Sequence, residues 1–326
     1  MNSIKHRLEY LDFCKVFAIF LVTLAHCAQQ LSGNKFPDLL LSKDSFISVN
    51  MAVFMLASGY VMNVEKMRLV STWDYLKNKA LRLLLPMTSW YLVMCIVSSQ
   101  YPRFAVYWSI YWYLGAMFIC LSTIKLLTLF IKSSILVAFI SIILLSLIPM
   151  ISFERSCYMI PFLWVGFLVR RYQENVTKPI VILFLILYII LYNFWDIRYS
   201  IYESPFHIWN VTSYTVYTLV FRFVIGVVGG AAIIYGSKFL IEYNTFKWMK
   251  IIAKFGPYTL VFYTMSFVLN SILGRLLWHI NVYFNTPGIL DVVSIGVTFI
   301  MMIIMYFSQV LIKKNRWLRL IFMGEK

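Results

Sequence analysis

Three ionisable side chains lie in the first apolar stretch of the sequence or directly before it: Asp12, Lys15 and His26. Lys15 and His26 are eleven residues apart, which places them within about 20° of one helix face and about 16 Å apart along the axis. Asp12 precedes Lys15 by three residues, so its carboxylate can hold the ammonium group. The stripe therefore predicts an ion pair at one end and, further along, an imidazole, which suits general-base catalysis near neutral pH.

Three more basic residues stand at positions that could bind a ligand. Lys79 and Arg82 are three residues apart and share one face of a predicted helix, so together with Lys15 they can bind a phosphate-bearing molecule. Arg222 lies in the middle of an apolar run, between two phenylalanines. A charge there must meet a carboxylate, a carbonyl or an anionic ligand. Two interpretations of Arg222 remain: it forms a structural ion pair, or it belongs to a ligand site.

The composition of the 326-residue chain indicates the solvent in which these charges lie. Hydrophobic residues make up 61% of the chain and charged residues only 13%, whereas soluble proteins carry about 25% charged residues. Too few polar side chains are present to cover a soluble domain. The composition predicts a protein that uses lipid as its solvent, and it excludes a disordered chain, a coiled coil and a secreted disulfide scaffold.

Ten apolar stretches approach the length of about 20 residues that a membrane-spanning helix needs. They are 13–31, 46–64, 83–98, 104–124, 134–152, 156–169, 179–195, 212–236, 255–274 and 289–312. We therefore expect an all-α polytopic membrane protein with about ten transmembrane helices. Residues 1–326 are expected to form a single transmembrane domain, with no separate soluble domain.

The basic residues are distributed unevenly between the two sides of this predicted bundle. Of the 29 lysines and arginines, 21 fall on the side of the amino terminus, six on the other side, and two, Lys15 and Arg222, within spans. Because Lys and Arg collect in cytoplasmic segments, we expect both termini to be cytoplasmic. This topology also accounts for the net charge of +16, so we expect no nucleic-acid partner.

Each candidate residue also has a purely structural interpretation. Asp12 and Lys15 can extend to the inner membrane interface. Lys79 and Arg82 can be interfacial anchors, and His26 can form a hydrogen bond to a neighbouring helix.

The five cysteines stand far apart and form no C-x-x-C pair. We expect buried thiols, and we expect no disulfide, no metal site and no bound cofactor. They are Cys14, Cys27, Cys95, Cys120 and Cys157.

Several motifs, in order along the chain, resemble those of the acyltransferase-3 family of integral-membrane O-acyltransferases. The segment from Arg7 to His26, RLxxLDxxK-x10-H, resembles the first-helix signature of the family. Five later segments resemble further family motifs: residues 54–60 (FMLASGY), 79–86 (KALRLLLP), 112–114 (WYL), 161–166 (PFLWVG) and 256–263 (GPYTLVFY).

The resemblance implies an enzyme that moves an acyl group, usually acetyl, from cytoplasmic acyl-CoA to a hydroxyl group. The acceptor is often a sugar of a cell-surface polysaccharide, such as an O-antigen, or its lipid-linked precursor. Carried over by position, His26 would be the catalytic histidine. Lys15, which Asp12 holds in place, would be the basic partner of His26. Lys79 and Arg82 would bind the donor. The resemblance implies a multi-pass protein of the cell membrane, and the membrane we expect is the bacterial inner membrane.

The sequence departs from the family pattern at three points. Lys15 and Lys79 stand where arginine is common, so a point charge replaces a bidentate fork. Ser266 stands where many members have a histidine, so we expect no catalytic role at that position. We also expect no attached extracytoplasmic hydrolase-like domain of the kind that some members carry.

The expected mechanism is direct attack by a sugar hydroxyl on the thioester, with His26 as general base in a water-poor site. Arg222, Tyr113 and Ser58 are candidates for stabilising the oxyanion. An acyl-histidine intermediate and acyl groups other than acetyl remain open. Trp112 and Tyr113 also fit an interfacial aromatic belt. The predicted acyl and acceptor pocket comprises Ser58, Trp112, Tyr113, Arg222 and Tyr263.

Two other classes of protein compete with this hypothesis. A polytopic carrier or flippase of lipid-linked sugars would also use intramembrane charge and basic inner loops, but it would need neither acyl-CoA nor the stripe from Lys15 to His26. A sensory or scaffolding membrane protein would explain none of the intramembrane charges.

Overall fold

The computed structural model describes residues 8–33, 48–148, 150–172, 176–199, 208–243, 246–284 and 286–325. All regular secondary structure in these segments is helical. The α-helices are α1 (Glu9–Leu31), α3 (Asn50–Tyr60), α4 (Val64–Leu69), α5 (Thr72–Ser98), α6 (Phe104–Ile110), α7 (Trp112–Phe130), α8 (Ser134–Ser146), α9 (Ile151–Tyr172), α10 (Lys178–Tyr192), α11 (Ser213–Glu242), α12 (Lys247–Ala253), α13 (Thr259–Ile280), α14 (Pro287–Lys313) and α15 (Arg316–Met323). A short 3-10 turn, η4 (Gly256–Tyr258), precedes α13.

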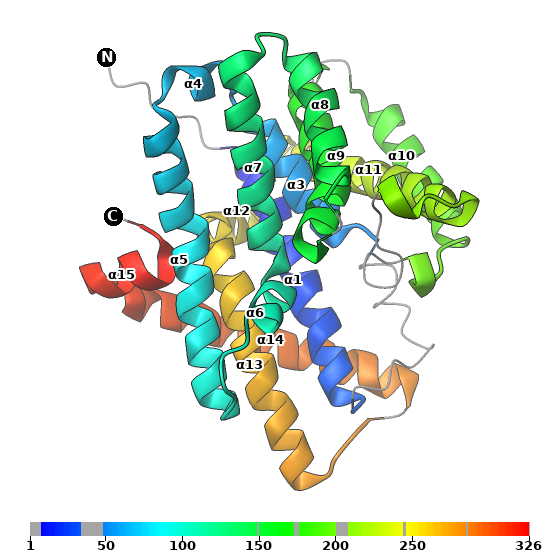
Figure 1. The fold of residues 1–326 in the computed structure, drawn as a ribbon. Coiled ribbons are helices and arrows are strands. Elements are labelled where there is room, and N and C mark those ends of the chain that lie inside the picture. Colours follow the sequence, from blue (N-terminus) through cyan, green and yellow to red (C-terminus); the bar gives the residue numbers. More distant parts are fainter. Residues whose placement is uncertain are drawn as a thin grey trace.

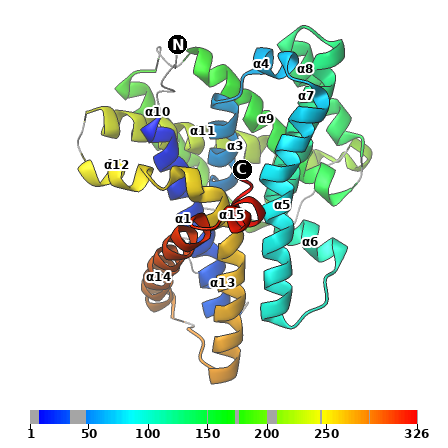
Figure 2. The same cartoon turned by 90° about the vertical axis from the view of Figure 1, so that its left-hand side faces the viewer.

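Helix α1 lies at the centre of the bundle, where α3, α11, α12, α13 and α14 all pack against it. On one side, α5, α7, α8 and α9 form a layer in which α7 contacts the other three (Figure 1). Helix α10 packs against α11 at the outer edge of the molecule. The view in Figure 2 shows α13 between α1 and α5, and α13 contacts both. The helix that carries the predicted catalytic stripe is therefore also the helix around which the bundle is built.

Six helical segments in the described residues are long and apolar enough to cross a membrane. They correspond to α1, α5, α7, α11, α14 and the segment Lys247–Ile280, while α8 and α10 are shorter apolar helices. Each of the ten predicted stretches overlaps a helix. The structure thus confirms the all-helical class and a multi-pass membrane protein. The count of ten spans and the side on which the termini lie stay predictions.

Helix α3 spans Asn50–Tyr60, and of the described part of the predicted stretch 46–64 it leaves residues 48–49 and 61–64 outside. It lies deep in the bundle and crosses α9 at two glycines. A Cβ atom at Gly59 would lie 1.8 Å from the carbonyl oxygen of Leu163, and a Cβ atom at Gly166 would lie 2.1 Å from that of Leu56. Only glycine permits this close approach, so the Ser-Gly and Pro-to-Gly motifs meet at one helix crossing.

The predicted stretch 104–124 is not one helix. It breaks at Tyr111 into α6 and α7, and the Tyr111 hydroxyl donates a hydrogen bond to the carbonyl of Thr264 at 3.2 Å. The rings of Trp112 and Tyr113 are buried. The interfacial-belt interpretation of these two residues is therefore wrong, because α9 and α13 cover the start of α7.

Candidate functional site

A cavity of about 760 Å³ lies at the end of the bundle where α1 and α5 begin. Side chains from α1, α3, α4, α5 and α7 line it, together with the η4 turn, the first turns of α13, and Met323 and Glu325 at and after the end of α15. Seven of the ten predicted site residues face this space: Asp12, Lys15, Ser58, Lys79, Arg82, Tyr113 and Tyr263.

The mouth of the cavity is basic. Four cations line it: Lys15, Lys66, Lys79 and Arg82. The ammonium group of Lys79 lies 5.4 Å from the centre of the Tyr75 ring, a cation–π contact that holds the charge in place. Two carboxylates, Asp12 and Glu325, are also present, so the lining keeps an excess of positive charge. Such a mouth suits a ligand that carries more than one phosphate group.

The predicted ion pair on α1 is present. The Lys15 Nζ atom lies 3.5 Å from an oxygen of Asp12, and Asp12 is only 9% exposed. The η4 turn presses directly on this carboxylate, because a Cβ atom at Gly256 would lie 2.3 Å from the Asp12 Cβ atom. Gly256 thus lets the turn approach and fixes where the Lys15 charge is held.

Helix α15 closes one side of the mouth. Pro86 has no N–H group, so the carbonyl of Arg82 has no helical partner four residues on. Gly324, in the left-handed conformation at φ +65°, lies against that exposed main chain, since its Cβ atom would be 2.6 Å from the Arg82 Cα atom. Trp90 anchors the same segment by donating a hydrogen bond to the carbonyl of Phe322 at 3.1 Å. This packing brings Glu325 to the cavity.

The inner part of the cavity is aromatic and carries hydroxyl groups. The ring centres of Tyr113 and Tyr263 lie 5.6 Å apart, and those of Phe54 and Tyr113 lie 5.5 Å apart. Ser58 lines the same part of the cavity as Tyr113. This region can accommodate an apolar chain and offers hydroxyl groups near its end.

His26 does not line the cavity. It lies further along α1, where its ring centre is 4.9 Å from that of Phe267. The ring of Phe267 in turn lies 5.3 Å from Tyr263. Two aromatic contacts, through Phe267 and Tyr263, therefore connect the imidazole to the wall of the cavity.

Arg222 and Trp112 also lie outside the cavity. Arg222 is 2% exposed. Its Nε atom donates to the carbonyl of Thr218 at 3.3 Å, and its guanidinium lies 5.0 Å from the Tyr158 ring centre. Trp112 is covered by the guanidinium of Arg155 at 5.5 Å. The structure therefore does not bring either residue to the basic cavity with Ser58, Tyr113 and Tyr263.

Sequence reasoning missed several residues that shape the site. Lys66 and Glu325 reach the cavity from segments far along the chain from Lys15, and no spacing rule connects them. Tyr75 could have been found from the helix, because it lies one turn before Lys79 on the same face.

Within the described residues, no group of three or more His, Cys, Asp or Glu side chains could hold a metal ion. The five cysteines are buried free thiols.

A helical bundle with several candidate membrane spans and a basic cavity beside its central helix defines a class of polytopic integral-membrane protein. The family model described as an acyltransferase domain, that of the acyltransferase-3 family, matches residues 8–307, and the chain belongs to this family. Membership supports O-acyltransferase activity. Neither the curated proteins nor the solved structures include a significant match to the chain.

Proposed function

We propose that the protein transfers an acyl group, in the first place acetyl, from cytoplasmic acyl-CoA to a hydroxyl of a cell-surface polysaccharide or lipid-linked sugar. The observation that carries the proposal is the cavity itself. Its mouth holds Lys15, Lys79 and Arg82, and its inner wall leads through Tyr263 towards the helix face of His26.

In this proposal, each region of the cavity binds a different part of the donor. Coenzyme A carries a diphosphate and a 3′-phosphate at one end and the thioester at the end of a flexible arm. The phosphates would bind the basic mouth through charge-assisted hydrogen bonds. The arm would then place the thioester near Tyr113 and Tyr263.

In the proposed reaction, the acceptor hydroxyl gives its proton to a ring nitrogen of His26 while its oxygen attacks the thioester carbonyl carbon. The tetrahedral intermediate collapses, the carbon–sulfur bond breaks, and the sulfur leaves with the proton returned by the imidazolium. The products are an O-acyl ester and free coenzyme A. Tyr113 and Ser58, two of the hydroxyl-bearing residues that line the cavity, would donate hydrogen bonds to the oxyanion.

The proposed orientation follows from the distribution of basic residues. With both termini cytoplasmic and about ten spans, the basic mouth opens to the cytoplasm, where acyl-CoA is made. His26 then lies about 16 Å further into the membrane along α1, on the way to an acceptor that arrives from outside. In a bacterium this places the protein in the inner membrane.

The decisive experiment measures base-labile O-acetyl groups on surface polysaccharide in cells that express wild-type protein or His26→Ala at matched membrane abundance. Ester formation by the wild type alone supports the transferase and the role of His26. Equal ester formation by both contradicts His26 as the base, and a trapped acyl-histidine contradicts direct attack. Movement of a lipid-linked sugar without any need for acyl-CoA would instead identify a carrier.

A further inference from the structure

Helix α4 is a short helix at the edge of the cavity. It lies between α3 and α5 in the chain and packs against α7. It spans only Val64–Leu69, too few residues to be stable as an isolated helix. Its position must therefore come from contacts with the rest of the protein. Val64 and Met67 of α4 are buried in the core, and two basic side chains add polar contacts.

The first contact is a buried lysine. Lys125 on α7 is 0% exposed, and its ammonium group donates hydrogen bonds to the carbonyls of Met67 at 2.7 Å and Val70 at 2.8 Å. These carbonyls lie at the carboxyl end of α4, where a cation satisfies main-chain oxygens and interacts favourably with the helix dipole. An ammonium group is costly to bury without such bonds, so this arrangement ties α4 firmly to α7.

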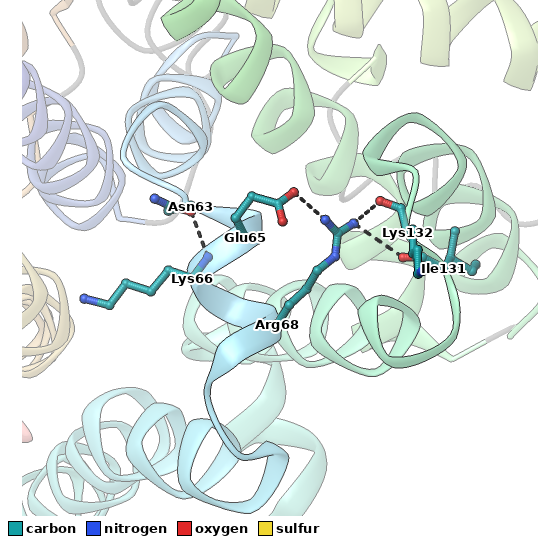
Figure 3. Close-up of polar contacts among 6 residues, drawn as sticks. All are labelled: Asn63, Glu65, Lys66, Arg68, Ile131 and Lys132. Atoms are coloured by element: carbon teal, nitrogen blue, oxygen red, sulfur yellow. Dashed lines mark hydrogen bonds and ion pairs between the residues drawn. The ribbon is translucent and has the colours of Figure 1, made fainter.

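The second contact comes from α4 itself. Arg68 forms an ion pair with Glu65 and donates hydrogen bonds to the carbonyls of Ile131 and Lys132, just after α7 (Figure 3). Lys125 and Arg68 thus hold α4 to the same end of α7 from two sides of the interface.

With Arg68 directed to α7, Lys66 is directed the other way. Figure 3 shows the side chains of Lys66 and Arg68 pointing away from each other, and Lys66 lines the cavity with Lys79 and Arg82. Its main-chain N–H group is capped by the Asn63 side chain at 2.9 Å. Lys132 and Lys77 lie at the same end of the protein and do not line the cavity, so a basic residue at this end need not face it.

We propose that Lys66 binds a phosphate group of the acyl-CoA donor and that Lys125 is a positioning residue that holds α4 so that Lys66 reaches the cavity. The inference rests on the proposed donor. It assigns four cations to a ligand with two separate phosphate positions: Lys15, Lys66, Lys79 and Arg82.

The test measures binding of reduced coenzyme A to the purified full-length protein in lipid nanodiscs, without any acceptor or acyl transfer. Lys66→Gln should weaken binding about tenfold, the equivalent of one charge-assisted hydrogen bond. Lys77→Gln removes the same charge outside the cavity and should leave the affinity unchanged. Pantetheine, which has no phosphate, should bind wild type and Lys66→Gln equally.

The positioning role is tested by a double-mutant cycle. Lys125→Met should weaken coenzyme A binding as Lys66→Gln does, and the double variant should bind no more weakly than either single variant, because both changes remove one contact. If Lys125 has a purely structural role, the fold-losses in coenzyme A affinity of the two single variants should multiply in the double variant. That result would overturn the positioning role. If Lys125→Met does not fold, Arg68→Gln replaces it in the same cycle, with the same expected outcome.

Failure of this inference is distinct from failure of the proposed function. If the wild type binds coenzyme A and transfers acetyl groups while Lys66→Gln binds equally well, the role of Lys66 is overturned and the transferase stands. If binding depends on Lys66 but no acyl transfer is found, the site stands and the transferase does not. If the wild type binds no coenzyme A, both are overturned.

Discussion

The ring of His26 lies against the ring of Phe267, with centres 4.9 Å apart and planes inclined by 53°. Phe267 also contacts Tyr263, which lines the basic cavity. Phe267 therefore contacts both the imidazole and a residue of the cavity wall, although it does not line the cavity itself. If the thioester binds in the cavity, we expect Phe267 to lie on its path to His26.

This relationship predicts that Phe267→Ala increases hydrolysis of the acyl donor in the absence of an acceptor. Removal of the ring joins the cavity to the surroundings of His26, so water reaches the thioester in the absence of an acceptor. We expect acetyl-CoA hydrolysis without acceptor to rise severalfold, as measured by release of free thiol. Phe299→Ala, which removes an exposed ring on α14, is the control. Unchanged hydrolysis in Phe267→Ala would show that Phe267 is not the barrier.

His26 should affect chemistry and leave donor binding intact. Because His26 lies outside the cavity, His26→Ala should reduce acyl transfer about 10²- to 10⁴-fold, the usual contribution of a general base, with little change in coenzyme A affinity. His279→Ala, at an exposed position near the end of α13, should behave as the wild type. A parallel loss of donor affinity in His26→Ala would mean that the imidazole binds the donor instead.

The sequence was sufficient to predict the helical class and the stripe on α1, because both depend on local periodicity. The ion pair between Asp12 and Lys15 follows from a spacing of three residues. Lys66 and Glu325 were missed, because their approach to the cavity depends on how α4 and α15 pack against distant helices. The sequence left both an interfacial belt and a pocket open for Trp112, because its burial depends on neighbours such as Arg155 that are distant in the chain.

The approach of Gly256 to Asp12 predicts a defect in donor use. In Gly256→Ala the new methyl group would lie 2.6 Å from an Asp12 carboxylate oxygen, so the carboxylate must move and Lys15 loses its fixed position. We expect the KM for acetyl-CoA to rise about tenfold, the equivalent of one charge-assisted hydrogen bond, with kcat less affected. Gly236→Ala has only an ordinary contact at 3.9 Å and is the matched control. An unchanged KM would show that the position of Asp12 is not important for donor binding.

The crossing of α3 and α9 predicts opposite signs for two substitutions of the same kind. Gly→Ala in a helix interior usually stabilises by about 0.5–1 kcal/mol, because glycine loses more backbone freedom on folding. Gly296→Ala in α14 meets no atom within 4 Å and should follow this rule. Gly59→Ala would push a methyl group into the carbonyl of Leu163, so α3 and α9 must separate, at a cost of about 1–3 kcal/mol. Thermal unfolding of the purified protein in detergent should show a lower midpoint for Gly59→Ala and an equal or higher one for Gly296→Ala. Equal midpoints for both variants would contradict the close crossing of α3 and α9. They would also contradict a packing role for Gly59 in the Ser-Gly motif.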